Sequence, residues 1–158
     1  MCIRVHLWIK NNMFFRVLQI AIPFVWFGAV CAISFMEAPL KFTAPNITIP
    51  LGLGIGMIVF HTLNRVEIVL CILLALSFFM ARSKGKFAPG AFAVIALILI
   101  IQTFVLFPML DERAIAVING TASPFSNLHI VYIVSDSIKV LLLLILGVSL
   151  ARGSIKYE

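Results

Sequence analysis

Residues 128–150, LHIVYIVSDSIKVLLLLILGVSL, decide the fold of this chain. The segment is long enough to cross the hydrocarbon core of a bilayer, which takes about 20 mostly apolar residues. Three similar segments precede it, at residues 14–36, 54–80 and 88–109. Because lipid offers no hydrogen-bond partners to the backbone, each segment must be a helix. The sequence therefore predicts an all-α membrane protein, built as a four-transmembrane-helix bundle.

The composition agrees with a chain whose main partner is the lipid bilayer. Of the 158 residues, 63% are hydrophobic and only 11% are charged, whereas charged residues make up about a quarter of a soluble domain. Residues 1–158 are therefore predicted to form one transmembrane domain, with no length left for a soluble catalytic module. The net charge of +6 is divided among short flanks of the apolar segments, which does not favour nucleic acid as a partner.

Basic residues indicate how the bundle is oriented. Eight of them flank the segments on one side, and two, Lys41 and Arg113, lie on the other. Since cytoplasmic loops carry an excess of Lys and Arg, both termini are predicted to be cytoplasmic. We expect the membrane to be a bacterial inner membrane or its equivalent. The eight residues are Arg4, Lys10, Arg16, Arg82, Lys84, Lys86, Arg152 and Lys156.

Two of the segments contain ionisable residues, which cost about 2.5–3.5 kcal/mol each at the centre of a membrane helix. In residues 128–150, a spacing of i, i+3, i+7 and i+10 places polar side chains on one helical face. The second segment holds a similar group, and one glutamate ends the first segment near the same level. The candidate pocket residues are His61, Asn64, Arg65, Glu67, His129, Tyr132, Asp136, Lys139 and Glu37.

The depth of these residues predicts an asymmetric bundle. Counting about 20 residues from the cytoplasmic charges places the ionisable side chains one to two turns inside the outer boundary. We expect two acid–base pairs between the second and fourth helices, with Arg65 as the first partner of Asp136 and Lys139 as the alternative. The cytoplasmic half should be dry and rich in Leu, Ile and Phe, whereas the outer half should contain a polar pocket.

Prolines and glycines predict local features of the helices. Pro23 should kink the first helix, and Pro108 should end the third. Gly52, Gly54 and Gly56 form a GxGxG pattern at the start of the second helix. Since no strand precedes this pattern, close helix packing is a better interpretation than dinucleotide binding.

Three functions fit these observations. The first is binding or conduction of a small ligand, ion or proton in an outward-facing polar pocket, with Glu67 and Asp136 as its negative groups. The second is a non-catalytic structural or assembly subunit, in a homo-oligomer or a larger membrane complex, whose polar residues hold helices together. The third is a redox protein linked to quinone or to a haem ligated by His61 and His129.

We expect no enzymatic activity, because no Ser/His/Asp or Cys/His nucleophile arrangement can be assembled from the sequence. The three cysteines have no CxxC spacing, so neither a disulfide framework nor a zinc site is predicted. No resident metal or cofactor is expected beyond the haem alternative.

Two short runs, WFG at residues 26–28 and FMEAPLKF at residues 35–42, carry a family resemblance. The second run resembles the F-x-x-A-P-x-x-F signature of the domain of unknown function 4149, a four-helix membrane family related to transmembrane protein 205. Residues 108–113 resemble the family's Pro and Arg ending of the third span, and His129 opens the last span. The resemblance covers residues 26–147 and implies a four-span membrane protein. It implies no active-site role, and Asp136 and Lys139 match none of its motifs.

The predicted orientation can be tested with topology reporters. A reporter fused after Glu158 should be active in the cytoplasm, and one inserted near Asn119 should be active outside, because eight basic flanking residues lie on one side against two on the other. An external C-terminal reporter would contradict the four-span topology.

Overall fold

The computed structural model describes residues 2–81, 87–123 and 127–155, and every regular element in these ranges is a helix. Four of the elements are long: α1 (Cys2–Val30), α3 (Ile49–Met80), α4 (Phe87–Ile101) and α6 (Asn127–Ile155). The others are shorter and extend them: the π-helical segments η1 (Cys31–Glu37) and η3 (Gln102–Leu106), α2 (Ala38–Leu40), the 3₁₀ segment η2 (Lys41–Thr43), and α5 (Phe107–Ile118).

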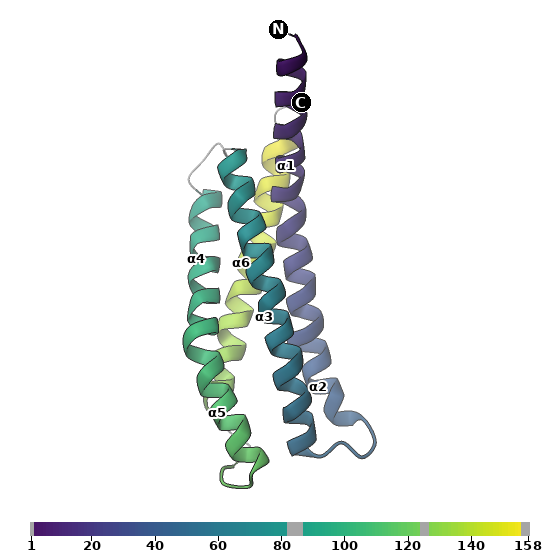
Figure 1. The fold of residues 1–158 in the computed structure, drawn as a ribbon, viewed down its shortest axis with the longest axis vertical. Helices are drawn as coiled ribbons and strands as arrows, with labels where there is room; N and C mark the ends of the chain where they lie inside the picture. The colour runs from purple at the N-terminus through teal and green to yellow at the C-terminus, as the bar shows by residue number, and fades with distance from the viewer. Residues whose placement is uncertain (1, 82–86, 124–126, 156–158) are drawn as a thin grey trace.

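The helices pack lengthwise into one bundle (Figure 1). α1 contacts α3 and α6, α4 contacts α6, and α5 contacts α3. The start of α1 and the end of α6 lie at one end, which we call the terminal end, whereas α2 and the end of α5 lie at the opposite end, the loop end (Figure 1). Four helical stretches are long and apolar enough to cross a membrane: Met13–Thr43, Ile49–Met80, Phe87–Ile118 and Asn127–Ser154.

These stretches confirm the predicted all-helical architecture with four candidate spans. The side of the membrane on which the termini lie stays a prediction. Residues 82–86 and Lys156, which supply half of the orienting charges, lie outside the described residues, as do the side chains of Arg4 and Lys10.

The third helical stretch differs from its prediction, because it continues to Ile118 and does not end at Pro108. Proline lacks an N–H and its ring clashes with the carbonyl four residues earlier in an α-helix. Here the π-helical η3 precedes it, and Pro108 lies in the first turn of α5, where a proline is tolerated. Asp111 and Arg113 therefore lie on a helix and not after one.

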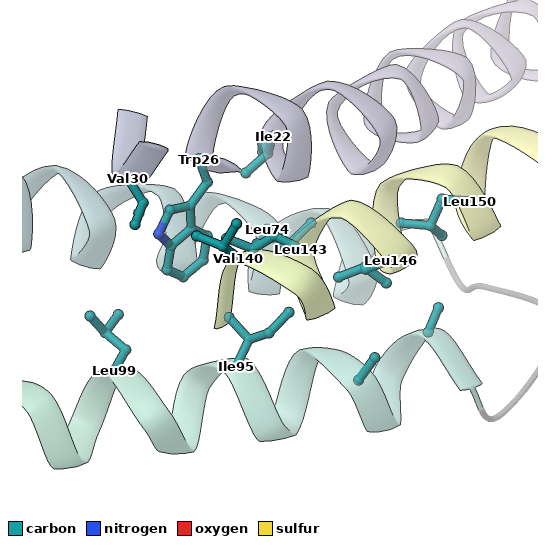
Figure 2. Close-up of a cluster of buried hydrophobic side chains, with 12 residues drawn as sticks. Ile22, Trp26, Val30, Leu74, Ile95, Leu99, Val140, Leu143, Leu146 and Leu150 are labelled. Atoms are coloured by element: carbon teal, nitrogen blue, oxygen red, sulfur yellow. The ribbon is translucent and has the colours of Figure 1, made fainter. Parts of the chain in front are cut away.

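An apolar core fills the terminal half of the bundle (Figure 2). Side chains from α1, α3, α4 and α6 point toward one another, and the fully buried Trp26 lies among them. The labelled members are Ile22, Trp26, Val30, Leu74, Ile95, Leu99, Val140, Leu143, Leu146 and Leu150. The buried members of this half are mostly Leu, Ile, Val and Ala, with phenylalanines only partly buried beside them, and Trp26 is its largest buried side chain.

A buried glutamine closes the terminal end of α3. The side-chain amide of Gln19 donates to the backbone oxygens of Ser77 at 2.8 Å and Ala81 at 2.5 Å. The oxygen of Ser77 also accepts from the backbone N–H of Ala81 at 2.9 Å, whereas the oxygen of Ala81 follows the last turn and has no partner within the helix. Gln19 therefore satisfies a group that would be costly to leave unbonded in an apolar surrounding.

The outer surface of the bundle is strongly apolar. Phe79, Phe104 and Ile58 are 87%, 75% and 71% exposed, and many other large hydrophobic side chains are exposed along the same helices. Soluble monomers rarely expose contiguous apolar surface on this scale. The surface and the four apolar helices together indicate a membrane protein.

Close packing of α6 on α1 gives a stability prediction. A Cβ at Gly147 would lie 2.9 Å from Cζ of Phe24, whereas a Cβ at Gly153 on the same helix would meet no atom within 4 Å. Gly147→Leu should lower the thermal stability, because overpacking costs about 1–3 kcal/mol. Gly153→Leu should be neutral or stabilising, since leaving glycine gains up to about 1 kcal/mol of helix propensity. Equal melting temperatures for the two variants in detergent would contradict this packing.

Candidate functional site

A lysine with no exposure to solvent lies at the centre of the bundle. Nζ of Lys139, on α6, lies 2.6 Å from Oε1 of Glu67, 2.8 Å from Oδ1 of Asp136 and 2.6 Å from Oε1 of Gln102. An ammonium has three N–H donors and no acceptor, so these contacts use its full capacity. Lys139 thereby joins α3, η3 and α6.

Two further contacts complete this group. The indole Nε1 of Trp26 donates to Oε1 of Glu67 at 2.7 Å, and Nε2 of Gln102 donates to Oδ1 of Asp136 at 2.8 Å. All five side chains are buried. We call Trp26, Glu67, Gln102, Asp136 and Lys139 the Lys139 cluster. Every one of the four helical stretches contributes to it.

A pocket of about 680 Å³ extends from this cluster toward the loop end. Its walls come from η1, α2, η2, α3, α5 and α6, which include the elements that Figure 1 places at that end. The walls are largely apolar and include the aromatic rings of Phe42, Phe60, Phe107 and Tyr132. Asp136 belongs to both the pocket wall and the Lys139 cluster.

Three buried side-chain oxygens at the pocket make no hydrogen bond of normal distance and angle among the described residues. They are Oδ2 of Asp136, the hydroxyl of Tyr132 and the hydroxyl of Ser34. All three residues line the pocket. The hydroxyl of Tyr132 lies close enough to Ser34 and to Asp136 for a side-chain interaction with each, although neither contact meets the distance and angle of a hydrogen bond. A buried polar atom left without a partner costs about 1–3 kcal/mol. Their common position defines a polar floor for the pocket.

Both π-helical segments lie beside this floor. η1 contains Ser34, and η3 contains Gln102 and begins one turn before Leu106, which packs against Tyr132. π-Helical turns are rare and often occur at functional sites, because the extra residue per turn changes where side chains point. Here η1 carries Ser34, whose hydroxyl faces the pocket floor, and η3 carries Gln102, whose amide belongs to the Lys139 cluster.

Two glycines of α3 allow side chains of η2 to pack closely against the pocket wall. The ring of Phe42 contacts Gly52, and Nζ of Lys41 would lie 3.0 Å from a Cβ at Gly56. The predicted close packing is therefore confirmed at these two positions. A Cβ built at Gly54 would meet no atom within 4 Å, so the prediction of close packing is wrong at that position.

The structure brings together only part of the predicted set. Glu67, Asp136 and Lys139 meet in the Lys139 cluster, and Tyr132 and His129 line the pocket. Arg65 is exposed and does not take part. The expected pairing of Arg65 with Asp136 is therefore wrong. Instead, the ammonium of Lys139 pairs with both Glu67 and Asp136. The observed partner of Asp136 is therefore the alternative, Lys139 on the same helix.

The other predicted residues have separate partners. Nε2 of His61 lies 2.8 Å from Oδ2 of Asp111, and its ring stacks on Phe107. Asn64 donates to Thr103 at 2.9 Å. Glu37 forms a salt bridge of 3.4 Å with Lys41.

Three members of the site are absent from the set predicted from the sequence: Trp26, Ser34 and Gln102. A serine in an apolar helix usually bonds to its own backbone, so Ser34 gives no signal of a site. The indole N–H is a usable signal for Trp26, since a buried Trp generally requires an acceptor. Gln102 lies inside an apolar segment and bonds across helices to Asp136 and Lys139.

Comparison with known proteins identifies no relative: no family model, no curated protein and no solved structure matches this chain. The resemblance to the domain of unknown function 4149 stays a prediction. Within the described ranges, no group of three or more His, Cys, Asp and Glu side chains is arranged to hold a metal ion. The haem hypothesis is not tested by this arrangement.

The contacts of Lys139 predict its effect on stability. Lys139→Gln leaves two buried carboxylates without their ammonium and should lower the free energy of unfolding by about 3–5 kcal/mol. Arg65→Gln, the matched control at an exposed position, should change it by less than about 0.5 kcal/mol. A denaturing-detergent titration measures both. In double-mutant cycles, Asp136→Asn should couple to Lys139→Gln and be additive with Arg65→Gln; the reverse result would contradict the observed cluster.

Proposed function

We propose that the protein binds a small organic ligand, with an apolar body and a polar end, in the pocket at the loop end. The observation that carries this proposal is the coincidence of three unpartnered buried polar atoms with the floor of an otherwise apolar pocket. Ligand sites in proteins typically have volumes of about 300–1,000 Å³, mostly apolar walls and a few convergent polar groups. The pocket, at about 680 Å³, has each of these properties.

A purely structural role explains less of the arrangement. An interhelical clasp requires that its polar atoms be satisfied, since an incompletely bonded network is less stable than an apolar one. The contacts of Lys139 with Glu67, Asp136 and Gln102 meet that requirement. The hydroxyls of Ser34 and Tyr132 and Oδ2 of Asp136 lie outside it, and a ligand that bonds to them accounts for their burial.

The predicted orientation indicates the side of the membrane from which the ligand enters the pocket. If both termini are cytoplasmic, the loop end faces outward, and the pocket receives its ligand from outside or from the outer leaflet. The apolar core of the terminal half would then separate the bound ligand from the cytoplasm. The proposal is therefore one of binding from the outer side.

A neutral probe can test this function. 2-Naphthylmethanol has an aromatic body and one hydroxyl, and in lipid nanodiscs we expect it to bind the protein saturably at one site, as measured by isothermal titration calorimetry. Ala114→Trp fills the pocket from α5 and should weaken binding at least about ten-fold, or 1.4 kcal/mol.

Ala93→Trp is the matched control, because Ala93 is exposed on α4 and should leave the affinity unchanged. Empty nanodiscs correct for partitioning of the probe into lipid. An equal loss of binding in both variants would contradict a ligand-binding function and favour the structural subunit, as would the absence of saturable binding of this probe together with its charged analogues.

A further inference from the structure

We propose that the ligand is an organic cation, and that it enters the pocket in exchange for one proton held by the Lys139 cluster. This inference rests on the proposed function and names the chemical class of its ligand. It follows from the charges of the cluster, the position of Asp136 and the aromatic walls of the pocket.

The charges of the cluster do not balance when all its groups are ionised. The salt bridges of Glu67 and of Asp136 both end at the single ammonium of Lys139, so one negative charge has no counterpart. An isolated charge in an apolar interior is costly, and such a site gains a proton or a counter-ion. In the empty pocket, one shared proton supplies the balance.

The neighbouring groups do not change this balance. The two remaining members of the cluster, the indole of Trp26 on α1 and the amide of Gln102 on η3, are uncharged. The cluster also interacts with the thiols of Cys31 on η1 and Cys71 on α3, and with the phenol of Tyr132 on α6. Thiols, phenols, amides and indoles are uncharged at neutral pH.

The charged groups nearer the mouth have partners of their own. Lys41 on η2 pairs with Glu37, and His61 on α3 pairs with Asp111. Arg113 on α5 donates to the backbone oxygen of Ser123 at 3.0 Å. His129 also lines the pocket, on the first turns of α6. These groups lie near the loop end of the bundle, whereas Lys139 contacts Asp136 at the floor of the pocket.

Asp136 connects the unbalanced charge to the pocket. Oδ1 of Asp136 is taken by Lys139 and Gln102, whereas Oδ2 has no partner among the described residues. Asp136 lines the pocket, and neither Glu67 nor Lys139 is part of the wall. A bound ammonium can therefore reach the cluster at Oδ2.

The aromatic rings of the pocket wall can attract a cation, beside Lys41 and Arg113, which also line the pocket. A cation is attracted to the face of an aromatic ring within about 6 Å. Nζ of Lys41 already lies 5.3 Å from the ring centre of Phe60 and 5.7 Å from that of Phe42. The ring centroid of Tyr132 lies 5.7 Å from that of Phe107 and 5.6 Å from that of Phe60. These rings form an aromatic wall between the mouth and the acidic floor.

The exchange conserves charge and protons. Before binding, the cluster holds one ammonium, one carboxylate and one carboxylic acid. As the organic ammonium arrives, the acid proton leaves to bulk water, and the carboxylate of Asp136 accepts a hydrogen bond from the ligand. One cation enters and one proton leaves, so the charge inside the bundle is unchanged. The affinity for the cation should therefore rise with pH while the cluster still holds its proton.

Three probes with one aromatic body test the inference: 2-naphthylmethylamine, which is an ammonium ion at neutral pH, 2-naphthylmethanol, and 2-naphthoate. Calorimetry in nanodiscs, repeated in buffers of different ionisation enthalpy, gives both the affinity and the protons released. We expect the amine to bind at least about ten-fold more tightly than the alcohol at pH 7. We expect about one proton released per amine and none per alcohol, and an amine affinity that rises about ten-fold per pH unit.

Glu67→Gln leaves one carboxylate for one ammonium, so the excess charge is lost. In this variant, proton release should disappear, the pH dependence should flatten, and the ratio of amine to alcohol affinity should fall toward one. Glu112→Gln removes an exposed carboxylate on α5 and should retain all three properties. If Glu67→Gln fails to fold, the proton release and pH profile of the unaltered protein still decide the question.

The outcomes separate the two proposals. Equal affinities for amine and alcohol without proton release would overturn cation exchange and leave the ligand pocket intact. Tightest binding of 2-naphthoate would overturn it in favour of an acidic ligand held by the basic groups of the mouth. Failure of all three probes to bind would overturn the pocket itself.

Discussion

An ammonium ion removed from water must find three acceptors, and this requirement governs the arrangement of the bundle. Lys139 finds them on α3, η3 and α6, while Trp26 brings α1 to the same point. Inside a membrane, apolar side chains gain little by leaving lipid for one another, so packing and polar contacts decide how helices associate. The Lys139 cluster consequently fixes the rotation of each helical stretch about its axis, and with it the positions of all pocket residues.

The bundle changes character on either side of this cluster. On the terminal side, four fully buried side chains pack around Trp26: Leu74, Ile95, Leu143 and Leu146. On the loop side, glycines of α3 replace large side chains and both π-helical segments occur, so the helices enclose a pocket and not a second core. Close packing supports the cluster on the terminal side, and Asp136 links the cluster to the pocket on the loop side.

The helices were predictable from the sequence because lipid permits few alternatives. Segment lengths predicted four spans, and the spacing of Tyr132, Asp136 and Lys139 correctly placed them on one face of α6. Helix α3 was harder. It is apolar almost all round, so its pattern does not define a buried face. Arg65 and Glu67 lie about 160° apart around the axis, so they point to nearly opposite sides. Only the packed structure decides that Glu67 points inward and Arg65 outward. The π-helical turns, which also carry the chain past Pro108, had no signal in an apolar sequence.

A clasp between helices would be complete with one carboxylate and one ammonium, so the second carboxylate calls for a separate explanation. It adds one negative charge to a site without exposure, and the fold is stable only if that charge is balanced. A bound proton and a bound cation both neutralise this charge. A cation in the pocket would in addition form hydrogen bonds with Oδ2 of Asp136 and the hydroxyls of Ser34 and Tyr132. On the proposed exchange, occupancy of the pocket is linked to the stability of the bundle, since any species that binds the folded state alone stabilises it. On this proposal, the carboxylate of Asp136 both holds the helices together and selects what the pocket accepts.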